Sequence, residues 1–352
     1  KKELVEVVYV SIIMPVYNAA KWLADSITSI LHQDFDGVLE LSVYNDNSTD
    51  ETVDILRHYE RSLQDRNISL VLGNAGGQGE PNGVGFAKNK AIEQSSGAWL
   101  CFFDADDIML PGRIRLQYKT GLQNPHAIVG CKFRREPQES TTRYTKWANS
   151  LTNKQLYTQA YLSHGPTLIM PTWFCARQVY EKVGNFDETG KGTPEDLIFF
   201  YKHLELFGLL ERVDECLLIY RYHQSATSFS VQEDTIWNLR VEQLQRHVLS
   251  KWNSFTIWNA GKQGRKLFRS LSEENQEKVV AFCDVDQKKI TKGIYIFEES
   301  SKKSKPRIPI IHYSDAKTPF IICVKQDLTG GVLEGILCSL QLREGTDFFH
   351  FN

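Results

Sequence analysis

The sequence lacks any long apolar run, and this bears on membrane association. Across 352 residues with a mean hydropathy of −0.35, no stretch approaches the roughly 18 to 20 uncharged apolar residues that span a bilayer. The start of the chain does not resemble a secretory signal peptide. We therefore expect no membrane partner and a location in the cytoplasm or nucleus, with the cytoplasm preferred.

Paired cysteines and a strong net charge are also absent. The seven cysteines are an odd number, and none forms a Cys-x-x-Cys pair, which argues against a zinc site and against a disulfide framework. Several lie in apolar runs, where cysteine acts as a small hydrophobe, and this agrees with a reducing compartment. The net charge of −2 creates no global basic field, so any nucleic-acid contact requires a local patch.

The most informative segment that is present is FFDADD, residues 102–107, directly behind the apolar residues AWLC. A strand that ends in Asp-x-Asp holds carboxylate oxygens at its tip, where a divalent cation and a nucleotide diphosphate can share one site. Acidic clusters of this kind also cap helices or lie solvated in turns. The neighbouring segments decide between these interpretations.

Those neighbours predict alternating strands and helices. We expect strands at residues 8–18, 39–45 and 68–74, with helices after each, because β-branched runs stop at polar residues and are followed by helical apolar spacing. Ser48 or Thr49 is predicted to cap the second helix. This pattern indicates an α/β fold with a parallel sheet, in which ligands bind beyond the carboxyl ends of the strands.

Five segments then resemble, in order and spacing, the family 2 inverting glycosyltransferases with a GT-A fold. They are VSIIMPVYN (10–18), NDNSTD (45–50), GFAKNKA (85–91), FDADD (103–107) and PEDL (194–197). The resemblance covers roughly residues 8–230 and implies a Rossmann-like nucleotide-diphospho-sugar transferase domain. NDNSTD departs from the more usual Asp-Asp-Gly-Ser-Thr-Asp, which puts the ribose and turn contacts in doubt.

Other segments resemble more closely the members of this family that galactosylate queuosine in tRNA. They include PTWFCARQVYEKVG, RYHQSATS, FTIWNAGKQGRKLFRSL and VVAFCDVDQKKI. This resemblance implies a UDP-galactose donor and, as acceptor, a tRNA that carries queuosine at the wobble position of its anticodon, with tRNA-Tyr implied.

The family resemblance implies which residues hold the UDP-sugar donor. Pro15 and Tyr17 would flank the uracil, and Asp46 would accept a hydrogen bond from its N3–H. An Asx turn would also explain Asp46. Lys88 would contact the base or phosphates, or be a solvated helix lysine. The full implied donor set is Pro15, Tyr17, Asn18, Asp46, Lys88, Asp104 and Ala105, with Asp104 on the ribose.

The resemblance also implies a metal and a base. Asp106 and His223 would ligate Mn²⁺ or Mg²⁺, which neutralises the departing diphosphate, although a lone histidine is more often structural. Asp196 would deprotonate the acceptor hydroxyl, with Glu195 as the weaker candidate. Both acids also suit the first turn of a helix, whose N-terminus is expected to lower the pKa of Asp196.

The segment between donor motifs and base, roughly residues 130–193, is expected to read the acceptor. It interleaves basic and aromatic residues in KFRREP (132–137), RYTKW (143–147) and PTWF (171–174). Cations contact phosphates and rings stack on exposed bases, so the pattern suits RNA. Interleaving is nevertheless common, and a glycan acceptor stays open.

A domain boundary is predicted near residues 250–254, which gives a catalytic domain at 1–250 and a smaller Rossmann-like domain at 251–352. Gly261 and Gly264, with Asp284 or Asp286, form an incomplete dinucleotide fingerprint. We favour docking, RNA contact or oligomer contact over an active second nucleotide site. The basic run Lys302, Lys303, Lys305 and Arg307 would meet phosphate or, as we favour, form a mobile solvated loop.

Three functions remain. The first is a tRNA-queuosine galactosyltransferase, and the second a UDP-GlcNAc:β-galactoside β-1,3-N-acetylglucosaminyltransferase. The third is an inactive adaptor that only binds a nucleotide sugar or RNA. The intact Asp104, Asp106, Asp196 and His223 argue against the adaptor, because a binding module needs no base that faces a bound donor.

Overall fold

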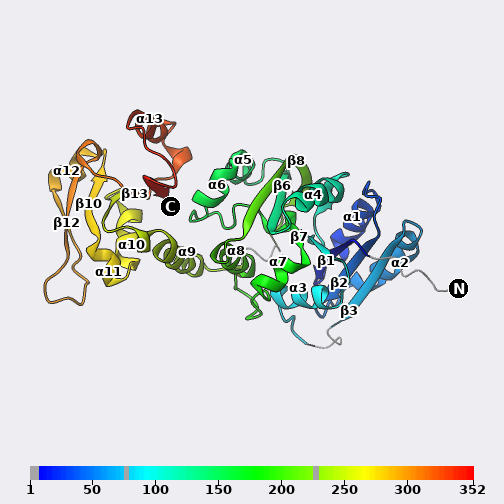
Figure 1. Cartoon of the computed structure of the whole chain (residues 1–352). Coiled ribbons are helices and arrows are strands. Elements are labelled where there is room, and N and C mark those ends of the chain that lie inside the picture. The colour runs from blue at the N-terminus through cyan, green and yellow to red at the C-terminus, as the bar shows by residue number, and fades with distance from the viewer. Residues whose placement is uncertain (1–7, 75–78, 225–229) are drawn as a thin grey trace. The chain divides into compact units, whose positions relative to one another are not determined.

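The computed structural model describes residues 8–74, 79–224 and 230–352 (Figure 1). Residues 75–78, in the Gly-rich segment before GFAKNKA, and the last residues of RYHQSATS lie outside them. The chain divides into two units, one of residues 1–156 and 166–232 and the other of residues 157–165 and 233–352. Each unit contains a sheet and helices, as an α/β fold requires.

The first unit is built on an eight-stranded sheet in the order β3-β2-β1-β4-β7-β6-β8-β5. β3, β2, β1 and β4 run parallel, and β7 joins β4 antiparallel. The strands are β1 (Val10–Val16), β2 (Leu39–Asn45), β3 (Ile68–Asn74), β4 (Trp99–Phe102), β5 (Ile108–Met109), β6 (Ala127–Glu136), β7 (Phe174–Ala176) and β8 (Leu209–Arg221). The strand order reverses between β1 and β4, and ligands bind beyond such points.

Helices connect and cover these strands. In α1 the residues Leu23, Ile27 and Ile30 recur at helical spacing and are fully buried. The helices of the unit are α1 (Ala20–Leu31), α2 (Thr52–Gln64), α3 (Val84–Glu93), α4 (Arg113–Gln123), α5 (Thr142–Ser150), α6 (Asn153–Thr158), α7 (Arg177–Val183) and α8 (Glu195–Glu205). The strand-helix alternation predicted for the first hundred residues is confirmed.

The turn after β2 differs from the predicted helix cap. α2 begins at Thr52, whose N–H donates to Asp50 Oδ1 at 3.1 Å. Ser48 Oγ instead accepts the Asn18 N–H, and the Thr49 N–H donates to Asn18 Oδ1, each at 2.8 Å. The predicted cap was wrong because these polar groups join the ends of β1 and β2.

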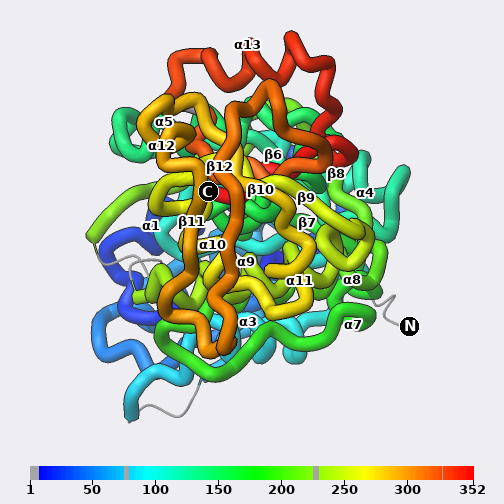
Figure 2. The backbone as a smooth tube through the Cα atoms, turned by 90° about the vertical axis from the view of Figure 1, so that its left-hand side faces the viewer, coloured from blue at the N-terminus to red at the C-terminus, as the bar shows by residue number. Residues whose placement is uncertain are grey.

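The second unit contains a six-stranded sheet in the order β11-β12-β10-β9-β13-β14. Figure 2 labels its strands β11, β12, β10 and β9. The five parallel strands of this sheet follow the order 3-2-1-4-5 of a Rossmann fold. The strands are β9 (Phe255–Trp258), β10 (Val279–Asp284), β11 (Ile294–Ile296), β12 (Arg307–His312), β13 (Phe320–Ile322) and β14 (Phe348–His350). The helices are α9 (Glu233–His247), α10 (Lys262–Ser270), α11 (Glu273–Glu277), α12 (Gln287–Lys292) and α13 (Val332–Ser339).

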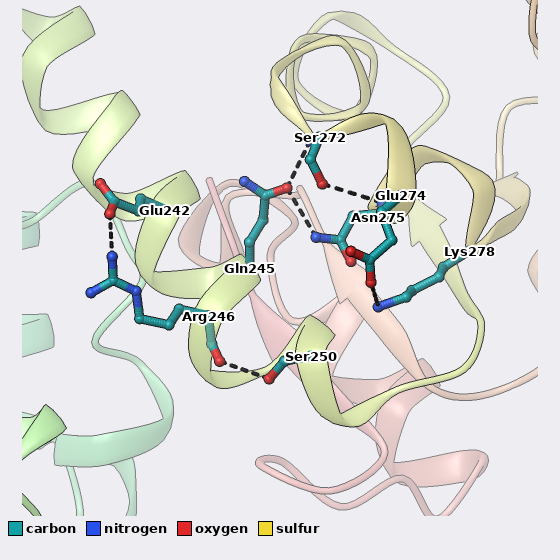
Figure 3. A pocket seen from close by; sticks show the side chains of 8 residues that line it. All are labelled: Glu242, Gln245, Arg246, Ser250, Ser272, Glu274, Asn275 and Lys278. Carbon is teal, nitrogen blue, oxygen red and sulfur yellow. Dashed lines mark hydrogen bonds and ion pairs between the residues drawn. The ribbon is translucent and has the colours of Figure 1, made fainter.

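Helix α9 groups with the second unit, although the predicted boundary at 250 places it in the first. Figure 3 shows the contact that ties it there: Gln245 Oε1 accepts the Ser272 N–H at 2.7 Å and the Asn275 amide at 3.0 Å. Trp237 of α9 also donates to Ser270 Oγ at 2.9 Å. These bonds satisfy polar groups of α9 on α10 and on the N-cap and first turn of α11.

The remaining expectations concern cysteines, charge and membranes. All seven cysteines are free, and five of them are buried. Lys303, Lys305 and Arg307 of the basic run are exposed, as expected for a solvated segment. Lys302 pairs with the exposed Glu277 of α11 at 2.8 Å. Within the described ranges, none of the helices combines the length and apolarity needed to cross a bilayer.

We predict that Gly264→Ala destabilises the second unit. A Cβ atom there would lie 1.9 Å from the Asn259 carbonyl oxygen, so the backbone of β9 or α10 must move. We expect a loss of roughly 2 kcal/mol in the free energy of unfolding, measured by urea denaturation. The matched control is Gly335→Ala in α13, where no atom lies within 4 Å, and helix propensity should add roughly 0.5 to 1 kcal/mol. Equal effects of both changes would contradict this account of the fingerprint glycine.

Candidate active site

Asp46 lies buried at the tip of β2, where it holds the loop before α3. Its Oδ1 accepts the Asn82 N–H at 3.0 Å and the Asn82 amide at 2.9 Å, and its Oδ2 accepts the Gly83 N–H at 2.8 Å. A carboxylate offers about four lone-pair positions, so the described residues leave one on Oδ2 for a ligand donor. The Asx-type bond to the Ser48 N–H comes from Asn45 instead.

The other predicted base contacts lie at the end of β1. Pro15 is half-buried within the strand, and the Tyr17 side chain is 47% exposed just beyond it. Asn18 adopts a left-handed φ of 48° and its side-chain oxygen serves the β2 turn. The structure thus leaves the Tyr17 ring accessible, whereas the side-chain oxygen of Asn18 already accepts the Thr49 N–H.

Three carboxyl groups follow β4 and form an acidic cluster: Asp104, Asp106 and Asp107. One oxygen from each lies within 4.8 Å of the others. Burial, together with the neighbouring acids, raises the pKa of Asp104 to about 6, although Lys88 opposes this shift. Burial, together with the charges of Asp106 and Asp104, raises the pKa of Asp107 well above its usual value. Such repulsion favours a bound cation.

A divalent cation fits this cluster. Asp107 is fully buried, and its Oδ2 has no hydrogen-bond partner in the described parts of the chain. His223 Nε2 lies 2.7 Å from Asp106 Oδ2, so the predicted metal ligands meet. Oxygen donors with one imidazole suit Mn²⁺ or Mg²⁺. Asp107 was missed by the sequence reasoning, although it stands next to Asp106 in FDADD. Ala105, which separates Asp104 from Asp106 in the chain, is buried, and its backbone carbonyl accepts the Ser26 hydroxyl at 2.6 Å.

Lys88 is not a solvated helix lysine. Its side chain is 4% exposed, and Nζ lies 2.7 Å from Glu195 Oε1. Burial acts to lower the pKa of Lys88, but the surrounding carboxylates outweigh it and raise the net pKa. Those carboxylates are Glu195, Asp104 and Asp196. Lys88 therefore joins the donor half of the site to the segment of the predicted base.

The approach of these two segments depends on glycine. A Cβ atom at Gly85 would lie 2.0 Å from the Asp187 carbonyl oxygen, and one at Gly83 would lie 2.9 Å from Gly190 Cα. Side chains at either position would push α3 away from the loop before α8. This close contact brings Lys88 to Glu195.

Asp196 lies in the first turn of α8, and its Oδ1 accepts the Leu197 N–H at 2.7 Å. Burial, with a smaller contribution from Glu195, raises the pKa of Asp196 to about 6, while Lys88 and the backbone N–H groups oppose the rise. The expected lowering by the helix N-terminus is therefore wrong in direction, because burial outweighs it. The carboxyl remains ionised at neutral pH.

In the predicted acceptor segment, Phe133 and Tyr144 pack around Arg135 together with Tyr220 of β8, and we call these three rings the aromatic cluster. The guanidinium carbon of Arg135 lies 3.8 Å from the Tyr220 ring centroid and 5.7 Å from those of Phe133 and Tyr144. Its Nε donates to Thr141 Oγ1 at 2.9 Å. Burial raises the pKa of the Tyr144 phenol, and the charge of Asp196 adds to this. The phenol is therefore protonated, and the charge of Asp196, the predicted base, acts on it.

In the second unit, the aspartate at the end of β10 has all its hydrogen-bond positions occupied by protein groups. Asp284 accepts four bonds, from the Ala260, Val285 and Asp286 N–H groups and from Lys289 Nζ. Asn259 donates to the Cys323 carbonyl at 2.8 Å, across the strand ends of β9 and β13. No lone pair of Asp284 is left for a ribose, so an active dinucleotide site is not favoured here.

Comparison with known proteins identifies the first unit. Residues 11–184 match the model of glycosyl transferase family 2. This region is a family 2 glycosyltransferase domain. An uncharacterized glycosyltransferase of Rickettsia prowazekii is 30% identical over 199 residues, which cover 54% of this chain and 57% of that protein. A second one, of Rickettsia typhi, is 27% identical and covers 70% of this chain and 71% of that protein.

Solved structures confirm the fold. The crystal structure of Staphylococcus aureus TarS residues 1–349 in complex with UDP-GlcNAc aligns with a TM-score of 0.53 at 18% identity. The alignment covers 76% of this chain and 71% of that one. The glycosyltransferase domain therefore has the expected GT-A fold.

We predict that Lys88→Met destabilises the glycosyltransferase domain by roughly 3 kcal/mol, because Glu195 would stay buried without its partner. The double change Lys88→Met with Glu195→Gln should recover most of this loss, since no unpaired charge remains. Lys90→Met on the same helix is the control, because its partner Glu93 is 69% exposed and such pairs contribute less than about 1 kcal/mol. Free energies of unfolding from urea titration decide, and a Lys88 effect no larger than that of Lys90 would contradict the assignment.

Proposed function

We propose that this chain transfers a hexose from a UDP-sugar to an acceptor hydroxyl, with inversion at the transferred carbon. The observation that carries the proposal is the buried ion pair of Lys88 Nζ with Glu195 Oε1 at 2.7 Å, which ties the helix after the donor motifs to the turn that carries Asp196. The charges of Asp104 and Asp196 also act to raise the pKa of Lys88. A cation site for the diphosphate and a carboxylate base thus share one buried neighbour. An inactive adaptor would not require this arrangement.

In this proposal each group has one task. A divalent cation held by Asp106, Asp107 and His223 would neutralise charge on the departing diphosphate. Asp104 and Asp46 orient the ribose and the uracil, and Tyr17 covers the base. Asp196 accepts the acceptor hydroxyl proton, while the Leu197 N–H donates to its Oδ1. Glu195 is engaged by Lys88, so it serves as a positioning residue rather than as the base.

We predict that Asp196→Asn lowers the transfer rate by about 10² or more and leaves UDP binding nearly unchanged. In the wild-type protein, the rate should fall as the pH drops through about 6, because the raised pKa protonates Asp196 there. A pH-rate profile and calorimetric titration of UDP provide the measurements. If UDP affinity collapses in Asp196→Asn, this residue binds the donor and the base lies elsewhere.

Two acceptors remain, each with its own support. TarS is named a poly(ribitol-phosphate) β-N-acetylglucosaminyltransferase and is 35% identical over 98 residues. A Campylobacter jejuni relative is named a β-1,3-glucosyltransferase. These names favour a glycan-directed enzyme, such as a UDP-GlcNAc:β-galactoside transferase. The closer sequence resemblance, with exposed Arg134 and Arg143 beside the aromatic cluster, favours queuosine-bearing tRNA and UDP-galactose. The tRNA reaction would also suit the predicted cytoplasmic location.

The deciding experiment offers the protein UDP-galactose or UDP-GlcNAc together with either tRNA or a β-galactoside, and weighs the products by mass spectrometry. If tRNA is the acceptor, Arg134→Ala with Arg143→Ala should weaken tRNA binding and lower its salt slope by about one per arginine, while UDP binding persists. Arg135→Ala is kept separate, because Arg135 packs inside the aromatic cluster. Elongation of the galactoside, with tRNA left unmodified, would establish the N-acetylglucosaminyltransferase reading.

A further inference from the structure

One aromatic side chain of α1, Trp22, lies against the proposed metal ligand His223. The two ring centroids are 5.1 Å apart and the planes meet at 25°, which is a stacked contact. On the imidazole, Nε2 reaches Asp106 Oδ2 at 2.7 Å. The indole therefore fixes the plane in which the histidine faces the acidic cluster.

The same indole also supports Arg221, two residues before His223. The guanidinium carbon of Arg221 lies 5.1 Å from the Trp22 ring centroid. In extended chain, residues two apart point to the same side, so one ring serves both side chains. The Arg221 N–H donates to Asp107 Oδ1 at 2.9 Å, which connects this support to the buried member of the cluster.

Two ion pairs hold Arg221 in this position. Its Nη2 lies 2.6 Å from Asp25 of α1, and its Nε lies 2.8 Å from Glu136 at the end of β6. The residue after Asp25 in α1 is Ser26, whose hydroxyl lies 2.6 Å from the carbonyl oxygens of both Ala105 and Asp107. Helix α1 thus contacts both the segment that carries Arg221 and His223 and the loop after β4 that carries the acidic cluster.

We infer that Trp22 is a positioning residue for the divalent cation: its indole holds the His223 imidazole in the orientation that completes the Asp106 and Asp107 site. This inference rests on the proposed metal site. It differs from it in predicting that a side chain without any metal-binding atom controls metal affinity. Groups that orient metal ligands typically change affinity by roughly 10- to 100-fold when they are replaced.

The test compares Mn²⁺ affinity by calorimetry, in the presence of excess UDP and against a protein-free UDP blank. We expect Trp22→Leu to raise the Kd for Mn²⁺ by roughly tenfold without a change in melting temperature, and Trp22→Phe to stay near the wild-type value because a flat ring remains. Trp99→Phe is the control, since Trp99 begins β4 at the end opposite to the acids. Asp106→Asn and His223→Ala test the metal site itself.

A second measurement does not depend on the folding of Trp22→Leu. Mn²⁺ quenches nearby indole emission, so wild-type fluorescence should fall on Mn²⁺ addition. Trp22→Phe should remove much of this quenching and Trp99→Phe should not. Unchanged quenching in Trp22→Phe, or wild-type affinity in Trp22→Leu while Asp106→Asn and His223→Ala lose binding, overturns the inference and spares the metal site. Wild-type affinity in those last two variants overturns the metal site of the proposed function.

Discussion

The buried ion pair between Lys88 and Glu195 is the interaction on which the site depends. It joins α3, which follows the loop that Asp46 holds, to the first turn of α8, which contains Asp196. Removing two charges from water is unfavourable unless other groups compensate. Here Asp104 and Asp196 add attraction, which explains why the pKa of a buried lysine is raised rather than lowered.

This single lysine does not balance the acids around it. Burial and mutual repulsion raise the pKa values of Asp104, Asp107 and Asp196 together. Arg113, fully buried behind the cluster, acts to lower that of Asp107 without reversing the shift. The site therefore carries more negative than positive charge. In the proposed reaction a divalent cation would offset this excess together with the charge of the diphosphate.

Much of this site could be predicted from the sequence, because parallel strands gather their carboxyl ends at one edge. That rule places Tyr17, Asp46 and Asp104 together without knowledge of any long-range contact. The partner of Lys88 could not be predicted in this way. Glu195 lies 107 residues further on, and the two meet only because Gly85 lets α3 approach the Asp187 backbone closely.

The failed expectations share a cause, which is that local rules omit burial and competing partners. Ser48 and Thr49 have the right chemistry for a cap, yet Asn18 binds them from the next strand. The helix N-terminus does act to lower the pKa of Asp196, but desolvation exceeds it. Two features leave no pattern in the sequence: the stacking of Trp22 on His223, and the lack of a hydrogen-bond partner for Asp107 Oδ2 among the described residues.

The two sheets show how one topology can keep or lose a ligand position. In each, an aspartate ends the second strand of a 3-2-1-4 arrangement and binds backbone N–H groups of a loop. Asp46 accepts three bonds and retains a lone pair, whereas Asp284 accepts four. The fourth bond comes from Lys289, a charge inside the second unit. A nucleotide there would have to displace that lysine, whereas in the first unit it would find an acceptor that the described residues leave available.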